Sequence, residues 1–356
     1  MDGSMTSTTH TVCPSCGGPV SDADRYCEAC GTELNPAAAG AGSPNTPALD
    51  TDTEPTVEIN TAPPVGPCVS CGGTIGADGY CETCGAKAAK VRDHFSEQPS
   101  PWVAGVCDRG IRHARNEDAL AIAADAEPGS RALLVVCDGV SSSLDSDVAS
   151  LAAARAARDV LTAGHAQGIG TESSRASAIV ARLKAAADAA SDAVLENTSP
   201  DSPNPASCTF VAAVLENGLL VAGNVGDSRA YWFPDNSAPV ALTVDDSWAA
   251  ELIATGIPRE QAESGPHAHA ITRWLGKDAP DHTPRTTTLK VAEPGWLLVC
   301  SDGLWNYCSE AAPLADLVRQ TAAAAGGEPL ATAAALVDWA NAQGGQDNIT
   351  VALARI

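Results

Sequence analysis

The stretch Trp296-Leu-Leu-Val-Cys-Ser-Asp302-Gly303-Leu304 ends a run of apolar residues in an Asp-Gly pair. A second stretch, Leu133-Leu-Val-Val-Cys-Asp138-Gly139, has the same form. An apolar run of this length, bounded by turn residues, is typical of a strand buried on both faces. A lone Asp-Gly pair usually marks only a turn. A carboxylate that directly follows a buried strand is, however, held rigidly at the end of a sheet, and the chain has two.

Three further acidic motifs lie at comparable places in the sequence. Asp227 follows an apolar strand in Gly-Asp-Ser-Arg, Asp347 directly precedes the last predicted strand, and Asp118 follows Asn-Glu. Five carboxylates at one end of a fold would repel one another unless cations neutralised them. Carboxylate oxygens are hard ligands, so the sequence predicts Mg²⁺ or Mn²⁺ at this place rather than Zn²⁺.

The rest of residues 102–356 alternates clusters of strands with pairs of helices. Asn217-Gly218 is typical of a two-residue hairpin turn. Clustered strands followed by paired helices indicate an α+β fold rather than a doubly wound parallel sheet. Strands are predicted at Val103–Cys107, Leu120–Ala123, Leu133–Cys137, Cys208–Leu215, Leu219–Asn224, Arg229–Trp232, Val240–Thr243, Thr287–Val291, Trp296–Cys300 and Ile349–Arg355, and helices at Ser146–Leu161, Ala176–Glu196, 312–325 and 328–342.

The first third of the chain carries a repeated cysteine pattern. Two copies of a double Cys-x-x-Cys unit supply the cysteines Cys13, Cys16, Cys27 and Cys30, then Cys68, Cys71, Cys81 and Cys84. Four thiolates at this spacing can surround one tetrahedral Zn²⁺, and metal binding would supply most of the folding energy of such short units. The pattern resembles zinc ribbons and predicts one structural Zn²⁺ per copy, two in all. Disulfides or redox-active dithiols are the alternatives.

These patterns divide the chain into five parts. We expect a first zinc ribbon at 11–34, a flexible linker at 35–66, a second ribbon at 67–86, a connector at 87–101 and a catalytic domain at 102–356. The linker is rich in Pro, Ala, Thr and Gly and cannot bury enough apolar surface to order itself. The connector, which begins near Ala-Lys-Ala-Ala-Lys, is predicted to form a short helix before Pro99 and Pro101. The five remaining cysteines lie beside apolar residues and are predicted to be buried free thiols.

The acidic composition excludes some classes of partner. The 356 residues include 21 basic and 44 acidic ones, so the net charge is 21 − 44 = −23. Such a chain is repelled by nucleic-acid phosphates and anionic lipids, so we expect neither nucleic acid nor a membrane as a partner. No stretch approaches the ~20 apolar residues of a membrane-spanning helix. The first residues also lack the features of a secretory signal, and we expect a cytoplasmic protein.

The order of the motifs resembles one family. Asn-Glu-Asp, Asp-Gly, Ser-x-Thr, Gly-Asp-Ser-Arg, Ser-Asp-Gly and Asp-Asn follow one another along residues 102–356. Each motif is weak alone, but six in this order resemble the 2C-type metal-dependent Ser/Thr protein phosphatases, the PPM family, in their bacterial form. The resemblance implies an antiparallel β-sandwich flanked by helix pairs, with a binuclear metal site at one end. It also implies phosphoprotein substrates and a Ser/Thr kinase system that supplies them.

The resemblance assigns the metal ligands. Asp138 would bridge two Mn²⁺ or Mg²⁺ ions, and the carbonyl group of Gly139 would bind the first. Asp302 and Asp347 would hold the second ion, and Asp227 would help to bind a third, looser one. A hydroxide that bridges the two metals would then attack the phosphorus of phosphoserine or phosphothreonine in line.

The resemblance also assigns residues that act on water and phosphate. Glu117 and Asp118 would orient metal-bound waters. The family places a phosphate-binding arginine five residues before that aspartate, where this chain has His113 between Arg112 and Arg115. If residues 112–118 are extended, His113, Arg115 and Glu117 project to one face and Arg112 to the other. We therefore expect Arg115, whose forked guanidinium can bind two phosphoryl oxygens, to anchor the phosphate, with His113 as a weaker contact.

Two further segments are compared with the family. Val140-Ser-Ser-Ser143 stands where the family usually has His or Met and then Gly-Gly, whereas residues 246–276 resemble its mobile flap beside the site. The leading hypothesis is an active protein phosphatase with the ribbons as a partner-binding or regulatory module. The alternatives are a pseudophosphatase or scaffold with little turnover, and a zinc-ribbon nucleic-acid module. The nucleic-acid module is disfavoured because residues 1–100 hold 13 acidic and 4 basic residues.

Overall fold

The computed structural model of the protein describes Val12, Val20 and residues 67–68, 71–164, 170–265, 267–268 and 270–356. Apart from Val12 and Val20, the first predicted ribbon and the predicted linker at 35–66 lie outside these residues. Among the described residues, no helix is both long enough and apolar enough to cross a membrane.

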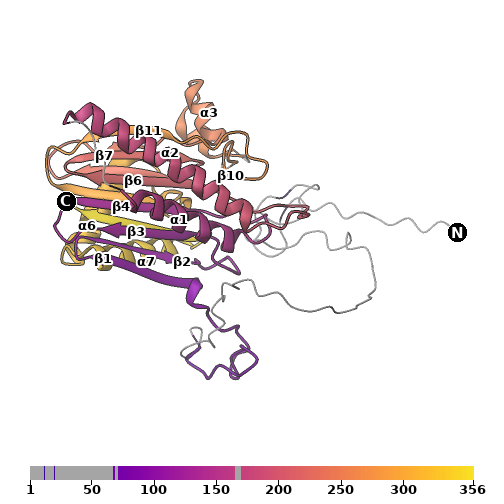
Figure 1. The fold of residues 1–356 in the computed structure, drawn as a ribbon. Coiled ribbons are helices and arrows are strands. Elements are labelled where there is room, and N and C mark those ends of the chain that lie inside the picture. The colour runs from indigo at the N-terminus through magenta and orange to yellow at the C-terminus, as the bar shows by residue number, and fades with distance from the viewer. Residues whose placement is uncertain are drawn as a thin grey trace.

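Two antiparallel sheets form the centre of the fold (Figure 1). The six-stranded sheet has the order β1-β2-β13-β12-β8-β9, and the five-stranded sheet has the order β11-β7-β6-β4-β3. A short pair, β10-β5, forms a third sheet. The strands are β1 (His94–Ser100), β2 (Val103–Asp108), β3 (Ala119–Ala124), β4 (Arg131–Cys137), β5 (Ser207–Cys208), β6 (Phe210–Glu216), β7 (Leu219–Val225), β8 (Arg229–Pro234), β9 (Val240–Ala241), β10 (Leu275–Gly276), β11 (Arg285–Lys290), β12 (Gly295–Cys300) and β13 (Ile349–Arg355).

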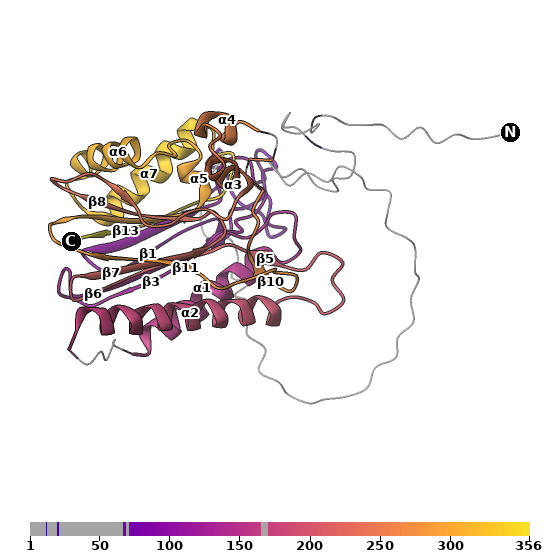
Figure 2. The ribbon, with the colours of Figure 1, turned by 90° about the horizontal axis from the view of Figure 1, so that it is seen from above.

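Helix pairs cover the outer faces of the sandwich, as Figure 2 shows. Helices α1 and α2 pack on the five-stranded sheet through alanine-rich faces, and α6 and α7 pack on the six-stranded sheet. A third apolar layer fills the space between the two sheets. The predicted α+β class is confirmed. The helices are α1 (Ser146–Thr162), α2 (Glu172–Glu196), α3 (Trp248–Ala254), α4 (Arg259–Glu263), α5 (Asp302–Trp305), α6 (Ala311–Ala324) and α7 (Pro329–Gln343).

The predicted connector helix is wrong apart from one 3₁₀ turn at Val91–Asp93. Residues 94–100 instead form β1, which pairs antiparallel with β2 at the edge of the six-stranded sheet. Phe95 packs against the inter-sheet core, and the Glu97 side chain accepts a hydrogen bond of 2.9 Å from the backbone N–H of Ile122. Pro99 is tolerated because it lies where the register shifts, between Glu97 and Ser100, on an edge strand. The sheet therefore begins eight residues before the predicted start of the catalytic domain.

Smaller differences concern element ends. Helix α2 begins at Glu172, four residues earlier than predicted, because the Thr171 side chain caps it by accepting a hydrogen bond from the N–H of Ser174. The predicted strand at Cys208–Leu215 divides into β5 and β6, which belong to different sheets. Between them, the N–H of Thr209 donates to the carbonyl of Asp138 at 2.7 Å. This break brings Thr209 to the end of β4.

Candidate metal centre

The predicted carboxylates meet at one end of the sandwich because antiparallel neighbours place the end of one strand beside the start of the next. Cys137 at the end of β4 pairs with Ala119 at the start of β3, so Asp138 lies beside Asp118. Cys300 at the end of β12 pairs with Val351 near the start of β13, so Asp302 lies beside Asp347. Each buried strand therefore delivers its acidic group to the same edge.

Asp118 is the most deeply enclosed of these carboxylates, with no exposed surface. Its Oδ2 atom accepts hydrogen bonds from the hydroxyls of Ser301 at 2.6 Å and Thr350 at 2.7 Å. Its Oδ1 atom is buried and receives no hydrogen bond from the described residues. Burial, with the charge of Asp302 added, raises the pKa of Asp118 to about 6 despite the two hydroxyl donors. A buried carboxylate oxygen without a hydrogen-bond donor is suited to bind a cation, or a water molecule that is itself bound to a cation.

Mutual repulsion affects the other carboxylates as well. Burial, followed by the charges of Asp118, Asp302, Asp347 and Asp227, raises the pKa of Asp138 well above its usual range. Burial and the charge of Asp302 likewise raise the pKa of Asp227 well above its usual range and that of Asp347 to about 7. The charge of Asp302 contributes to the raised pKa of all four of these carboxyl groups, so the acidic groups of five segments form one electrostatic cluster. Such a cluster favours divalent cations with oxygen ligands.

Gly139 allows the close approach of three segments at this cluster. Its N–H donates to the Glu117 carbonyl at 3.2 Å. A Cβ atom at position 139 would lie 2.7 Å from that carbonyl oxygen and 2.9 Å from the carbonyl oxygen of Ser146. A side chain here would push the Asp138 segment away from the Glu117 segment, and only glycine fits without a backbone shift.

Asn348 holds the Glu117 segment in place. Its Oδ1 atom accepts a hydrogen bond from the Glu117 N–H at 2.7 Å, and its amide nitrogen donates to the carbonyls of Arg109 at 2.7 Å and Arg115 at 3.1 Å. The Asn348 N–H in turn donates to Asp347 Oδ1 at 2.7 Å. One buried side chain thus fixes the loop that carries the expected water-orienting and phosphate-binding residues.

His113 and Arg115 both contact Glu117, but residues 110–115 are not extended: a turn at 110–112 is followed by a bend at 114–115. His113 is buried, with Nδ1 3.5 Å from Glu117 Oε2 and Nε2 3.3 Å from Asp347 Oδ1. Burial alone would lower the pKa of His113, but its bond to Glu117 and the charges of Asp347, Glu117 and Asp302 together raise it to about 9. The imidazole is therefore occupied as a cation between two carboxylates.

Arg115 is more accessible than His113. Its Nε atom donates to Glu117 Oε1 at 2.6 Å and its Nη2 atom to the Ser143 carbonyl at 3.1 Å, while Nη1 lies 4.0 Å from Asp147 Oδ1. Arg112 is exposed on the preceding turn. The guanidinium of Arg115 is therefore oriented by two fixed acceptors, and among the described residues its Nη1 atom makes only a loose ion pair with Asp147.

A second cluster consists of Cys68, Cys71, Cys81 and Cys84, whose sulfur atoms all lie within 4.8 Å of one another. The contacts Cys68–Cys84 at 3.6 Å and Cys71–Cys81 at 3.5 Å are far longer than the ~2.05 Å of a disulfide. The backbone N–H of Cys84, opposed by desolvation and helped by that of Thr83, lowers the pKa of Cys81 to about 6. The pKa of Cys71 is instead raised to about 12 despite the backbone N–H of Gly73, because of its contacts with Cys84 and Cys81. Four sulfurs at these distances fit tetrahedral Zn²⁺. The matching cysteines Cys13, Cys16, Cys27 and Cys30 lie outside the described residues.

Comparison with known families finds two matches along the chain. Residues 109–340 match the family model for protein phosphatase 2C, which covers more than half of the chain, and residues 13–85 match that for the double zinc ribbon. The chain belongs to the protein phosphatase 2C family. The resemblance inferred from the order of the six motifs is therefore confirmed.

Individual members of the protein phosphatase 2C family match most of the catalytic region. The serine/threonine phosphatase stp of Listeria welshimeri is 34% identical over 151 residues, which are 42% of this chain and 57% of stp. This sequence match therefore spans little more than half of that relative. The Mycobacterium tuberculosis serine/threonine phosphatase PstP/Ppp has a TM-score of 0.57 at 26% identity, over 71% of this chain and 97% of that one. The catalytic domain of PstP in complex with two manganese ions gives 0.54 at 25% identity over the same shares.

Sequence reasoning assigned no role to the residues that support the acidic groups of this phosphatase 2C domain. Ser301 and Thr350 donate to Asp118, and Thr209 Oγ1 accepts a hydrogen bond of 3.0 Å from the Asp138 N–H. Thr209 also contacts the Ser228 hydroxyl at 2.7 Å. Each is a small hydroxyl residue at the end of an otherwise apolar strand. That position is the signal that could have identified them.

The five remaining cysteines carry no sign of catalysis. All are free; Cys107, Cys137, Cys208 and Cys300 are buried, and Cys308 is half-buried. Burial raises the pKa of Cys137 well above its ordinary value, so the thiol next to Asp138 stays protonated. The sequence predicts that all five are buried free thiols, which is confirmed for four of them, whereas Cys308 is partly exposed.

Proposed function

We propose that this protein is a metal-dependent serine/threonine protein phosphatase that hydrolyses phosphoserine and phosphothreonine in protein substrates. The observation that supports it most strongly is the electrostatic cluster of Asp118, Asp138, Asp227, Asp302 and Asp347 at one end of the sandwich. Membership of the protein phosphatase 2C family and the names of the relatives support the same reaction.

The residues present fit Mn²⁺ or Mg²⁺. Asp138, the Gly139 carbonyl, Asp302 and Asp347 would hold two ions, and Asp227 would contribute to a third. The donors are hard oxygens, and the buried Oδ1 atom of Asp118 lacks a donor among the described residues. When bound, the ions supply Lewis acidity toward the phosphoryl group and lower the pKa of water. The two manganese ions in PstP support this assignment.

The residues of this chain then have distinct tasks in the proposed reaction. Glu117 and Asp118 accept hydrogen bonds from the attacking water and orient it. Arg115 binds phosphoryl oxygens through its Nη1 end, which among the described residues makes only a loose ion pair with Asp147, while its bonds to Glu117 and Ser143 fix its direction. His113 neutralises part of the charge of Glu117 and Asp347 from its buried position.

The position of His113 supports a second candidate function, a scaffold that binds metal and phosphoprotein with little turnover. His113 replaces the arginine that the family pattern places at this position, and both of its nitrogens face carboxylates. If Arg115 does not substitute for that arginine, phosphate binding is weak. Turnover of p-nitrophenyl phosphate by the full chain distinguishes the two functions.

The front of the chain has a separate role in this proposal. The two ribbons bind one structural Zn²⁺ each and recruit a partner or regulate the domain, while the 35–66 segment links them. Phosphoproteins made by a Ser/Thr kinase are the expected substrates, and the cytoplasm is the expected compartment. The division at 11–34, 67–86 and 102–356 stays a proposal, with β1 added to the catalytic part.

A metal-dependence assay tests the proposed function. The full chain is assayed with p-nitrophenyl phosphate and with a phosphothreonine peptide, in buffer with and without millimolar Mn²⁺. We expect turnover of both substrates that depends on Mn²⁺ or Mg²⁺. Turnover that is equal without added metal, or absent at every metal concentration, contradicts the proposed activity.

A further inference from the structure

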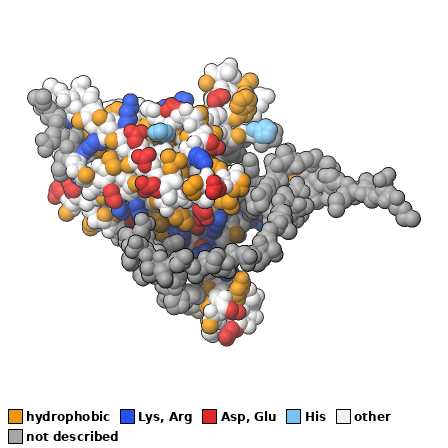
Figure 3. Space-filling model, turned by 45° about the vertical axis from the view of Figure 1, so that its right-hand side comes forward, with side chains coloured by type: hydrophobic (Ala, Val, Ile, Leu, Met, Phe, Trp, Pro, Cys, Tyr) orange, Lys and Arg blue, Asp and Glu red, His pale blue; other side chains and the backbone are white. Residues whose placement is uncertain are grey.

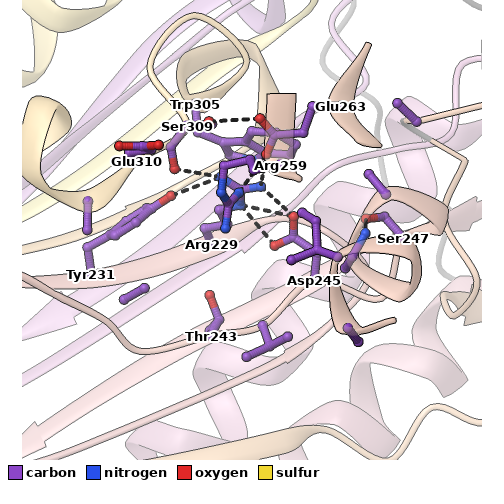
Figure 4. Close-up of a pocket in the computed structure, with 18 residues that line it drawn as sticks. Arg229, Tyr231, Thr243, Asp245, Ser247, Arg259, Glu263, Trp305, Ser309 and Glu310 are labelled. Atoms are coloured by element: carbon purple, nitrogen blue, oxygen red, sulfur yellow. Dashed lines mark hydrogen bonds and ion pairs between the residues drawn. The ribbon is translucent and has the colours of Figure 1, made fainter. Parts of the chain in front are cut away.

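Arg229 lies where three parts of the site region meet (Figure 4). It is the first residue of β8 and follows Asp227 by two positions. Its side chain is 9% exposed, although it borders a cavity of about 440 Å³ between α3, α4 and the sandwich. A buried arginine is costly unless its donors are satisfied, so its partners show what it holds together.

The first link runs to the flap, defined as residues 246–276. Arg229 Nε donates to Asp245 Oδ1 at 2.9 Å and Nη2 donates to Asp245 Oδ2 at 2.5 Å. This is a two-point pair, the strongest geometry that a guanidinium and a carboxylate can adopt. Asp245 directly precedes the flap, so the pair fixes the position at which the flap leaves the sandwich.

The second link runs to the segment that carries Asp302. The guanidinium carbon lies 3.4 Å from the centre of the Trp305 ring, and Nη1 donates to the Ser309 carbonyl at 3.0 Å. Trp305 is the last residue of α5, which begins at Asp302. Stacking on Trp305 therefore acts on the short helix whose first residue is an expected metal ligand.

The described contacts of the flap are unevenly distributed. At its base, Asp246 is fully buried and pairs with Arg273 at 3.1 Å and Arg285 at 2.9 Å. At its far end, Glu263 accepts a hydrogen bond of 3.0 Å from the Ser309 hydroxyl and lies 4.0 Å from Arg229. The cavity separates these two attachments. The flap helix α3 projects from the body, and hydrophobic side chains lie on that projection (Figures 1 and 3).

We propose that Arg229 is a positioning residue that couples the flap to the expected metal ligands Asp227 and Asp302. Arg229 is not one of the expected metal ligands. It holds the start of the flap, the turn after Asp227 and the helix after Asp302 in one arrangement through a single planar group. Lysine keeps the charge but cannot make the two-point pair, the stack and the Ser309 bond together. Only the kinetic test of this proposal depends on the proposed function.

The test compares Arg229→Lys with Arg355→Lys in the full chain. Arg355 is a matched control, because it makes a two-point pair with Asp235 at 2.9 and 2.7 Å and lies over the Trp296 ring. It lies at the opposite end of β13 from Asp347, roughly 20 Å away along the strand. Both substitutions remove the same chemistry, but only the first removes it beside the flap.

Two readouts are measured. Cleavage by trypsin after Arg259, which is 42% exposed in α4, reports release of the flap and is followed by mass spectrometry of the fragments. Calorimetric titration with Mn²⁺, and the Mn²⁺ concentration that gives half-maximal turnover, report the metal ligands. For Arg229→Lys we expect cleavage and the half-saturating Mn²⁺ concentration each to rise about fivefold or more, the scale of a weak site-to-site coupling. The control should match the unchanged protein.

A second variant keeps the test decisive. Asp245→Asn removes the pair from the flap side and should produce the same two effects. The double variant should be no worse than the stronger single one, because both remove one interaction. Unchanged cleavage and unchanged Mn²⁺ binding in both single variants overturn the proposal. If the unchanged protein shows no turnover, the proposed function fails, whereas cleavage and calorimetry still decide the role of Arg229.

Discussion

Replacement of Asp118 by asparagine should make the metal-free protein more stable. The Asp118 carboxylate is fully buried, and its pKa is raised from the ordinary 3.8 to about 6, first by burial and then by the charge of Asp302. About two pKa units correspond to about 3 kcal/mol of cost for the ionised form. Asparagine removes that charge, and its Oδ1 atom can still accept the hydrogen bonds from Ser301 and Thr350.

The pH dependence fixes the sign of this effect. A carboxyl group whose pKa is raised in the folded state favours folding in its protonated form, and this contribution is lost as the pH rises through the folded pKa. The advantage of Asp118→Asn should therefore be full above pH 7, about half at pH 5, and close to zero below the ordinary pKa of 3.8. Added Mn²⁺ should reverse the order, since the cation stabilises the charged site.

Thermal unfolding at pH 7.5 and pH 5, with and without Mn²⁺, measures these differences. A gain of 1 kcal/mol corresponds to roughly 2–4 °C for a domain of this size. Asp338→Asn is the control, because Asp338 is an exposed carboxylate on α7 and should change stability by less than about 0.5 kcal/mol. Removal of metal affects the zinc ribbons equally in all three proteins. If Asp118→Asn is less stable than the unchanged protein in metal-free buffer, or if its effect does not depend on pH, the electrostatic reasoning is refuted.

Three further predictions concern the two metal centres and the phosphate. Asp302→Asn removes a charged ligand and should lower Mn²⁺-dependent turnover at least about 10²-fold, and full activity in that variant would contradict the assignment. Arg115→Ala should raise the Michaelis constant for p-nitrophenyl phosphate about tenfold, near 1.4 kcal/mol of lost binding, while Arg112→Ala should change it little, and the reverse order would place the anchor on the other arginine. Elemental analysis should find about two zinc ions per chain, falling to one in Cys84→Ser, whereas half an equivalent or less in the unchanged chain would favour disulfides.

The strands that carry the site could be predicted from the sequence because they are uninterrupted apolar runs. β4 and β12 are buried along their whole length; β4 is followed directly by Asp138-Gly139, and β12 is followed by Ser301 and then Asp302-Gly303. The antiparallel pairing of β3 with β4 and of β12 with β13 then brings their carboxylates together without further information. The chemistry of the centre follows from this alternation of apolar strand and acidic end.

β1 could not be predicted in the same way. Its side chains alternate between exposed and half-buried, and Pro99 lies within it. Local propensity therefore indicates a connector, and the strand forms because the edge of β2 is available and Phe95 reaches the core. Tertiary contacts decide the structure of this segment, as they do for many edge strands.

The supporting hydrogen bonds were hidden by their distance along the chain. Ser301 and Thr350 reach Asp118 across 183 and 232 positions, and Asn348 reaches Glu117 across 231. Each looks like an ordinary polar residue beside a strand until the two sheets are packed together. A polar residue in a buried strand needs a partner, so its presence predicts a contact without naming the other residue.

The loop at 110–118 combines both situations. The extended geometry expected for residues 112–118 is wrong, because the N–H groups of Ile111 and Arg112 donate hydrogen bonds to the carbonyl of Gly345 and turn the chain. His113 and Arg115 nevertheless both reach Glu117, since Asn348 pulls the segment between them toward β13. His113 then has a carboxylate near each nitrogen, and the Nη1 end of Arg115 makes only a loose ion pair with Asp147 among the described residues. The His113 imidazole is enclosed between two carboxylates, whereas Arg115 is partly exposed, so Arg115 stays the proposed phosphate anchor.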